Sequence, residues 1–79
     1  MKLLANTVLF HYEKPVNYEI LLVKDILVFK PYFSHLENDF PCIILSRFPN
    51  GWQFQEKVPA QIKTQIQEDL LKLRLARSA

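Results

Sequence analysis

The amino-acid sequence predicts an α+β fold, in which an antiparallel sheet of four or five strands, in the order β-β-(β)-β-β-α, packs against one C-terminal helix. Up to residue 56 the chain is rich in β-branched, aromatic and aliphatic residues, and turn-forming residues interrupt them. From Pro59 onward the apolar residues recur every three or four positions, which is the period of an amphipathic helix. A chain of 79 residues has room for one hydrophobic core, so residues 1–79 are expected to form a single domain.

The first half of the chain predicts two or three strands. Residues 3–12 suit a first strand, and residues 13–17 supply a turn that contains a proline. Residues 18–33 form either one long bent strand or two strands that meet at Lys24-Asp25, where charges interrupt the apolar pattern. Residues 34–39 are predicted to be a polar connection.

The next segment predicts a β-hairpin. Residues 41–48 and 52–56 form its two strands, and Pro49-Asn50-Gly51 forms a three-residue turn between them. Glycine suits the left-handed position that closes such a turn, which explains why the only glycine of the chain lies here. Phe48 and Trp52 are then expected to be the closing pair, with their rings on the same face.

A C-terminal helix is predicted from Pro59, because the first helical position needs no partner for the missing N–H of proline. An apolar stripe at spacings of four, four and three residues is expected to face the sheet. This stripe and the strands give the predicted core, which consists of Val8, Phe10, Ile20, Leu22, Ile44, Trp52, Phe54, Ile62, Ile66, Leu70 and Leu73.

The strands carry apolar residues on both faces, which is unusual for a sheet with one helix. In a continuous second strand, Ile20 and Leu22 point one way while Leu21 and Val23 point the other. One amphipathic helix covers only one face of a sheet. Either the sheet curls into a half-barrel around its own side chains, or a second molecule covers the outer face. A break at Lys24-Asp25 would change which residues share a face.

Leu71 and Leu75 are the candidate partner contact on the helix. At 100° per residue they lie roughly opposite the apolar stripe, on the side that should face water. Leucines at this spacing anchor helix pairs and helices that dock into grooves. The alternative is that both are isolated exposed leucines in the last turns of the helix.

The sequence gives no catalytic, cofactor-binding or metal-binding residues. A single glycine excludes the glycine-rich phosphate loops, and His11, His35 and Cys42 lie far apart without the spacing of metal ligands. We interpret the two histidines as ordinary strand and loop residues, and the single cysteine as a buried thiol in a reducing compartment. We therefore expect no cofactor and no enzymatic activity.

Single-stranded nucleic acid is the alternative partner that the composition allows. Lys30, Tyr32 and Arg47 belong to a series of interleaved basic and aromatic residues, and sheets stack unpaired bases on exposed rings. The basic excess is small, however, because Lys and Arg number 10 against 8 Asp and Glu, a formal net charge of +2. Nucleic acid is accordingly the less favoured partner.

The apolar segments are too short to cross a membrane, since no run approaches the roughly 20 residues that a helix needs. The N-terminal apolar stretch is interrupted by Asn6-Thr7 and has no small-x-small cleavage site. We therefore expect a cytoplasmic protein without a membrane partner. Its layout, a Pro-Asn-Gly-Trp turn before a strand and a proline-started helix, is similar to that of many small bacterial α+β domains.

These observations favour a non-enzymatic protein-interaction module. Its expected partner is a second copy of the chain, which would make it a homodimer, or an unidentified protein. The two apolar faces of the strands and the pair Leu71 and Leu75 motivate this prediction.

Overall fold

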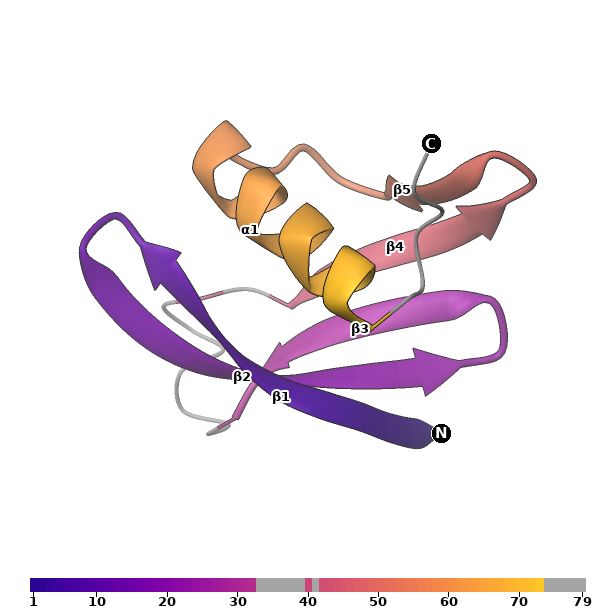
Figure 1. Cartoon of the computed structure of the whole chain (residues 1–79), viewed down its shortest axis with the longest axis horizontal. Helices are drawn as coiled ribbons and strands as arrows, with labels where there is room; N and C mark the ends of the chain where they lie inside the picture. The colour runs from indigo at the N-terminus through magenta and orange to yellow at the C-terminus, as the bar shows by residue number, and fades with distance from the viewer. Residues whose placement is uncertain (33–39, 41, 74–79) are drawn as a thin grey trace.

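A computed structural model describes residues 1–32, 40 and 42–73 of the chain. In these residues one antiparallel sheet with the strand order β1-β2-β3-β4-β5 precedes a single helix, which confirms the predicted α+β fold. Figure 1 shows the twisted sheet with the helix lying across one of its faces. The elements are β1 (Lys2–His11), β2 (Lys14–Val23), β3 (Ile26–Pro31), β4 (Ile43–Phe48), β5 (Gly51–Phe54) and α1 (Ala60–Lys72). No helix within the described ranges has the length and apolar character that crossing a membrane requires.

The strand-rich region of residues 18–33 divides into two strands at Lys24-Asp25. Val23 pairs with Ile26, so these two charged residues form the whole connection between β2 and β3. Lys24 has a φ of 54°, a left-handed conformation that lets the chain reverse within two residues. The reversal places Leu27 opposite Leu22, and both side chains therefore lie on the same face of the sheet.

The core lies between α1 and the inner face of the sheet. Alternate residues of β2, β3 and β4 are buried, as expected for strands that are covered on one face. The predicted helical stripe supplies the other half of the core. The buried hydrophobic residues are Leu9, Val16, Tyr18, Ile20, Leu27, Phe29, Ile43, Leu45, Ile62, Ile66 and Leu70. Four further predicted core residues, Leu22, Trp52, Phe54 and Leu73, are partly buried against it.

Three predicted core residues lie on the outer face of the sheet instead. Val8 and Phe10 are 43% and 47% exposed, whereas Leu9 between them is fully buried. Ile44 is half-buried. It lies on the outer face because the residues before and after it in β4 point toward α1. In both strands the apolar residues are consecutive, so the sequence pattern could not indicate which of them faces the core.

The turn between the first two strands is shorter than predicted and begins one residue earlier. The turn between β1 and β2 consists of Tyr12 and Glu13, and Tyr12 has a φ of 62°. The predicted turn over residues 13–17 is therefore wrong, and Pro15 belongs to β2 opposite Phe10. The predicted connection of residues 34–39 lies outside the described residues, as does Pro41.

The β4–β5 hairpin forms, with a loop of two residues rather than three. Gly51 pairs with Phe48 and begins β5, so Trp52 lies opposite Arg47 and not opposite Phe48 as predicted. Phe48 is 46% exposed, and Trp52 packs partly against the core. Gly51 has a φ of +128°, which side-chain-bearing residues rarely adopt.

Side-chain amides of α1 occupy the open edge of β1. The Phe10 backbone N–H donates to Gln65 Oε1 at 2.7 Å, and Gln65 Nε2 donates to the Phe10 carbonyl oxygen at 2.9 Å. The Tyr12 backbone N–H donates to Gln61 Oε1 at 3.2 Å. Because the polar groups of Phe10 point away from β2, its partner Pro15 loses no ladder hydrogen bond by lacking an N–H. The amide of Gln65 thus takes the place of a neighbouring strand.

We expect Gln65→Glu to destabilise the protein at neutral pH by about 1–2 kcal/mol. A carboxylate still accepts from the Phe10 N–H, but it cannot donate to the Phe10 carbonyl. The matched control is Gln67→Glu, which makes the same charge change at an exposed position of α1. Urea unfolding measures the free energy of each variant. Equal stability of the two variants would contradict the role of Gln65 at the strand edge.

We expect Gly51→Val to destabilise the protein by about 1–3 kcal/mol, because it forces a β-branched residue into a positive φ. Apart from the two chain neighbours of Gly51, no atom of the described residues lies within 4 Å of the position a Cβ would take. The cost therefore comes from the backbone and not from a clash. Gln53→Val, an exposed substitution in the same strand, is the control. A melting temperature of Gly51→Val equal to that of the control would show that the assigned φ is wrong.

Candidate functional site

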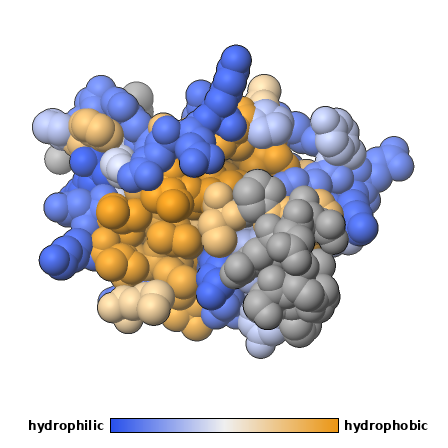
Figure 2. Space-filling model, turned by 180° about the vertical axis from the view of Figure 1, so that it is seen from behind, coloured by the Kyte–Doolittle hydropathy of each residue, from blue (hydrophilic) through white to orange (hydrophobic). Residues whose placement is uncertain are grey.

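The outer face of the sheet carries a continuous apolar surface, which we call the outer patch. Its central row follows directly from the strand register, since Leu21 pairs with both Leu3 and Val28, and Val28 pairs with Ile44. Side chains of directly paired residues point to the same face of a sheet. Figure 2 shows the patch as the orange area of the surface opposite α1. The outer patch consists of Leu3, Leu21, Val23, Ile26, Val28 and Ile44.

The residues of the outer patch are open to solvent to different degrees. Leu3 is 52% exposed and Ile26 is 37% exposed, and the other four are half-buried. These residues come from β1, β2, β3 and β4, so the patch spans most of the width of the sheet. A contiguous apolar surface of this kind is typical of sites where a soluble protein contacts a partner.

Polar residues border the outer patch on two sides. On one side Glu19 of β2 pairs directly with Lys30 of β3, and Asn6 of β1 lies next to Glu19. On the other side Ser46 pairs with Ile26, and Gln55 Nε2 donates to Ser46 Oγ at 2.6 Å. An apolar centre within a polar rim is the usual anatomy of a protein–protein interface.

The structure places one of the two predicted helix contacts. Leu71 is 52% exposed on α1, while Leu75 lies outside the described residues. Because α1 covers the inner face of the sheet, Leu71 belongs to a different layer from the outer patch. A contact through Leu71 and Leu75 stays a prediction.

The residues predicted for nucleic-acid binding do not gather on one surface. Lys30 and the exposed Tyr32 lie at one end of β3, where the Tyr32 N–H donates to the Asn17 carbonyl at 2.8 Å. Arg47 belongs to β4 and lies beside the other end of β3, where its backbone N–H donates to the Asp25 carbonyl oxygen at 2.9 Å. Seven residues of extended chain from Asp25 to Tyr32 span roughly 20 Å. The guanidinium of Arg47 lies 5.9 Å from the centre of the Trp52 ring, far from Tyr32.

His11 is a hydrogen-bonded strand residue, as predicted. Its Nε2 lies 2.8 Å from the Tyr18 hydroxyl, and its ring lies 4.6 Å from the centre of the Phe40 ring. Burial lowers the pKa of His11 below its usual value, since burial disfavours the imidazolium. Burial, followed by repulsion from the charge that Cys42 can carry, raises the pKa of Tyr18 to about 12. Both groups are therefore neutral at physiological pH. His35 lies outside the described residues.

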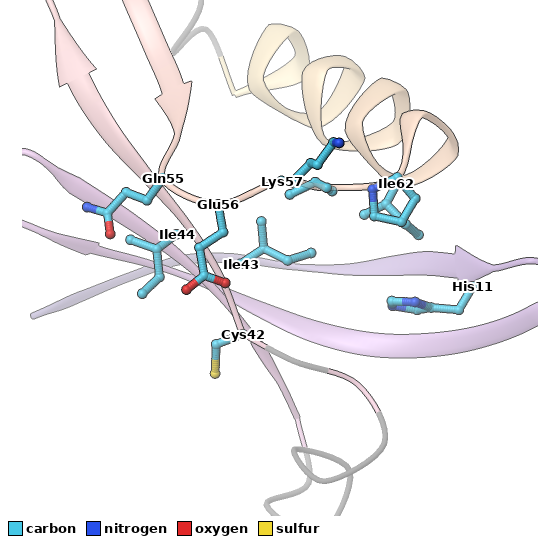
Figure 3. Close-up of a pocket in the computed structure, with 10 residues that line it drawn as sticks. His11, Cys42, Ile43, Ile44, Gln55, Glu56, Lys57 and Ile62 are labelled. Carbon is cyan, nitrogen blue, oxygen red and sulfur yellow. The ribbon is translucent and has the colours of Figure 1, made fainter.

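A pocket of about 170 Å³ lies between β4, the start of α1 and His11. Ile43, Val58 and Ile62 contribute apolar walls, and Cys42 and Glu56 contribute polar groups. Figure 3 shows that Cys42 and Glu56 lie at one end of the pocket and the His11 ring at the other, so these groups do not converge. The described residues contain no group of three His, Cys, Asp or Glu that could hold a metal ion.

Cys42 is exposed, which corrects the predicted buried thiol. The first residue of β4 is Ile43, whose side chain is buried in the core. Cys42 precedes the strand, and it therefore does not share the burial of the residues that follow it.

The lowered pKa of His11 predicts a pH dependence of stability. Below about pH 6.5 the unfolded chain binds a proton at His11, whereas the folded chain resists this protonation. The free energy of unfolding therefore decreases as the pH is lowered, until the pH passes the pKa of His11 in the folded state. The slope is at most about 1.4 kcal/mol per pH unit. His11→Phe keeps a ring beside Phe40 and should remove this slope in urea unfolding between pH 5.5 and 7.5. Parallel pH profiles of the two proteins would contradict the assignment.

Comparison with known proteins gives no relative from which these surfaces could be interpreted. No protein-family model, no curated protein and no solved structure matches the chain.

Proposed function

We propose that the chain is a non-enzymatic protein-interaction module that contacts its partner through the outer patch. The observation that carries this proposal is the unbroken cross-strand row of aliphatic side chains on the face of the sheet that α1 does not cover. Apolar surface removed from water contributes roughly 25 cal/mol per Å². A partner with an apolar surface would therefore gain most of its binding free energy from this row.

The polar groups support the non-enzymatic form of the proposal. A catalytic site brings a nucleophile, a base and a stabilising donor together around one reacting atom. His11 is engaged with the Tyr18 hydroxyl, and its ring lies at the opposite end of the pocket from Cys42 and Glu56. The outer patch, in contrast, presents aliphatic carbon and no reactive group.

Site-specific photo-crosslinking tests this proposal in extracts of the cells that express the protein. A benzophenone amino acid replaces Val28 in the outer patch, and in the control it replaces Gln67 on the exposed side of α1. We expect protein adducts from position 28 and not from position 67. An excess of the wild-type chain should compete for the adduct, whereas an excess of the Leu21→Glu chain should not. Equal adduct yields at both positions, or adducts with nucleic acid alone, would contradict the proposal.

A further inference from the structure

We infer that the partner of the outer patch is a second copy of this chain, packed face to face with its strands roughly aligned. The inference rests on the proposed function of the patch and adds the identity and orientation of the partner. In a symmetric dimer, two identical sheets that pack face to face are related by a two-fold axis that lies in the plane between them. The positions of the charges beside the patch decide the direction of this axis.

An axis along the strands, between β2 and β3, makes the surface complementary to itself. Such an axis exchanges β2 and β3, so each residue of β2 faces the residue of β3 with which it pairs in its own sheet. Leu21 then faces Val28 of the second copy, and Glu19 of each copy faces Lys30 of the other. Aliphatic side chains meet aliphatic side chains, and each carboxylate meets an ammonium group, which gives a dimer two equivalent charge pairs.

An axis across the strands gives no such match. If it passes through the row of Glu19 and Lys30, it brings each charge onto the same charge of the second copy. If it passes through the row of Leu21, it brings Glu19 onto the aliphatic Val23 of the second copy. The first arrangement places like charges opposite one another. The second desolvates a carboxylate against apolar carbon, and both are unfavourable. The order of charges therefore selects the axis along the strands.

The size of the surface indicates a weak dimer. Four strands about 4.8 Å apart and six residues of about 3.3 Å give a face of roughly 20 Å by 20 Å. A standard interface buries about 800 Å² on each partner, so this face lies below that size. We expect a dissociation constant in the micromolar range, with weaker association at high salt because the charge pairs at the rim are screened.

Charge reversal at the rim tests the orientation directly. Glu19→Lys and Lys30→Glu each place like charges opposite one another in a homodimer, and each should weaken self-association at least about tenfold. In an equimolar mixture of the two variants, Lys at position 19 of one chain faces Glu at position 30 of the other, and the reverse pair is also complementary. The mixture should therefore form a heterodimer close to wild-type affinity. Sedimentation equilibrium and native mass spectrometry measure the affinities and the composition of the dimers.

The mixing step separates contact between copies from effects within one chain. Each variant keeps two like charges side by side on its own sheet, whether or not the other variant is present. Circular dichroism at the working temperature checks that both variants are folded before they are mixed. Recovery of dimer only on mixing supports the face-to-face arrangement, and variants that remain monomeric in the mixture would overturn it.

Two further variants locate the interface. Val28→Lys in the outer patch should abolish the dimer, and Leu71→Glu on the helix should leave it unchanged. A dimer that Leu71→Glu dissociates and Val28→Lys does not would overturn the inference. A wild-type chain that is monomeric up to millimolar concentration would also overturn it. In that case a specific photo-adduct of position 28 with a different protein would still support the proposed function.

Discussion

One helix on a five-stranded sheet is the constraint on which the rest of this structure depends. The helix α1 buries one apolar stripe against one face, and the burial of alternate residues in β2, β3 and β4 follows from it. Strong twisting of the sheet lets the core close around α1, but it cannot turn side chains of the opposite face inward. The row from Leu3 to Ile44 is therefore a direct consequence of having aliphatic residues at consecutive strand positions and a single covering helix.

The two edges of the sheet are treated differently. At β1 the side chains of Gln61 and Gln65 bind the backbone groups of Phe10 and Tyr12, which removes part of the edge from pairing with another strand. At the other edge β5 has only four residues, and short edge strands are poor templates for aggregation. These features disfavour growth of the sheet through its edges, and they leave the apolar face as the surface for the proposed partner.

The sequence predicted those features that depend on local spacing. The stripe of Ile62, Ile66 and Leu70 follows from a 3.6-residue period, and the hairpin near Gly51 follows from turn chemistry, although its loop is one residue shorter than predicted. Leu9 could not be distinguished from its apolar neighbours, because three consecutive apolar residues fit either face of a strand. The turns at Tyr12 and Lys24 contain neither glycine nor asparagine, so their positive φ values had no sequence signal.

The outer patch shows why an apolar surface of this kind follows from topology. The alternation within β2 places Leu21 and Val23 together, but only the reversal at Lys24-Asp25 brings Val28 beside them and Glu19 beside Lys30. The same two-residue turn thus creates the apolar row and places the two charged residues side by side at its rim. Because folding buries only one face of so small a sheet, covering the second face would add free energy that the isolated chain lacks. If a second copy of the chain covers this face, the stability of the domain rises with protein concentration, because folding is then coupled to association.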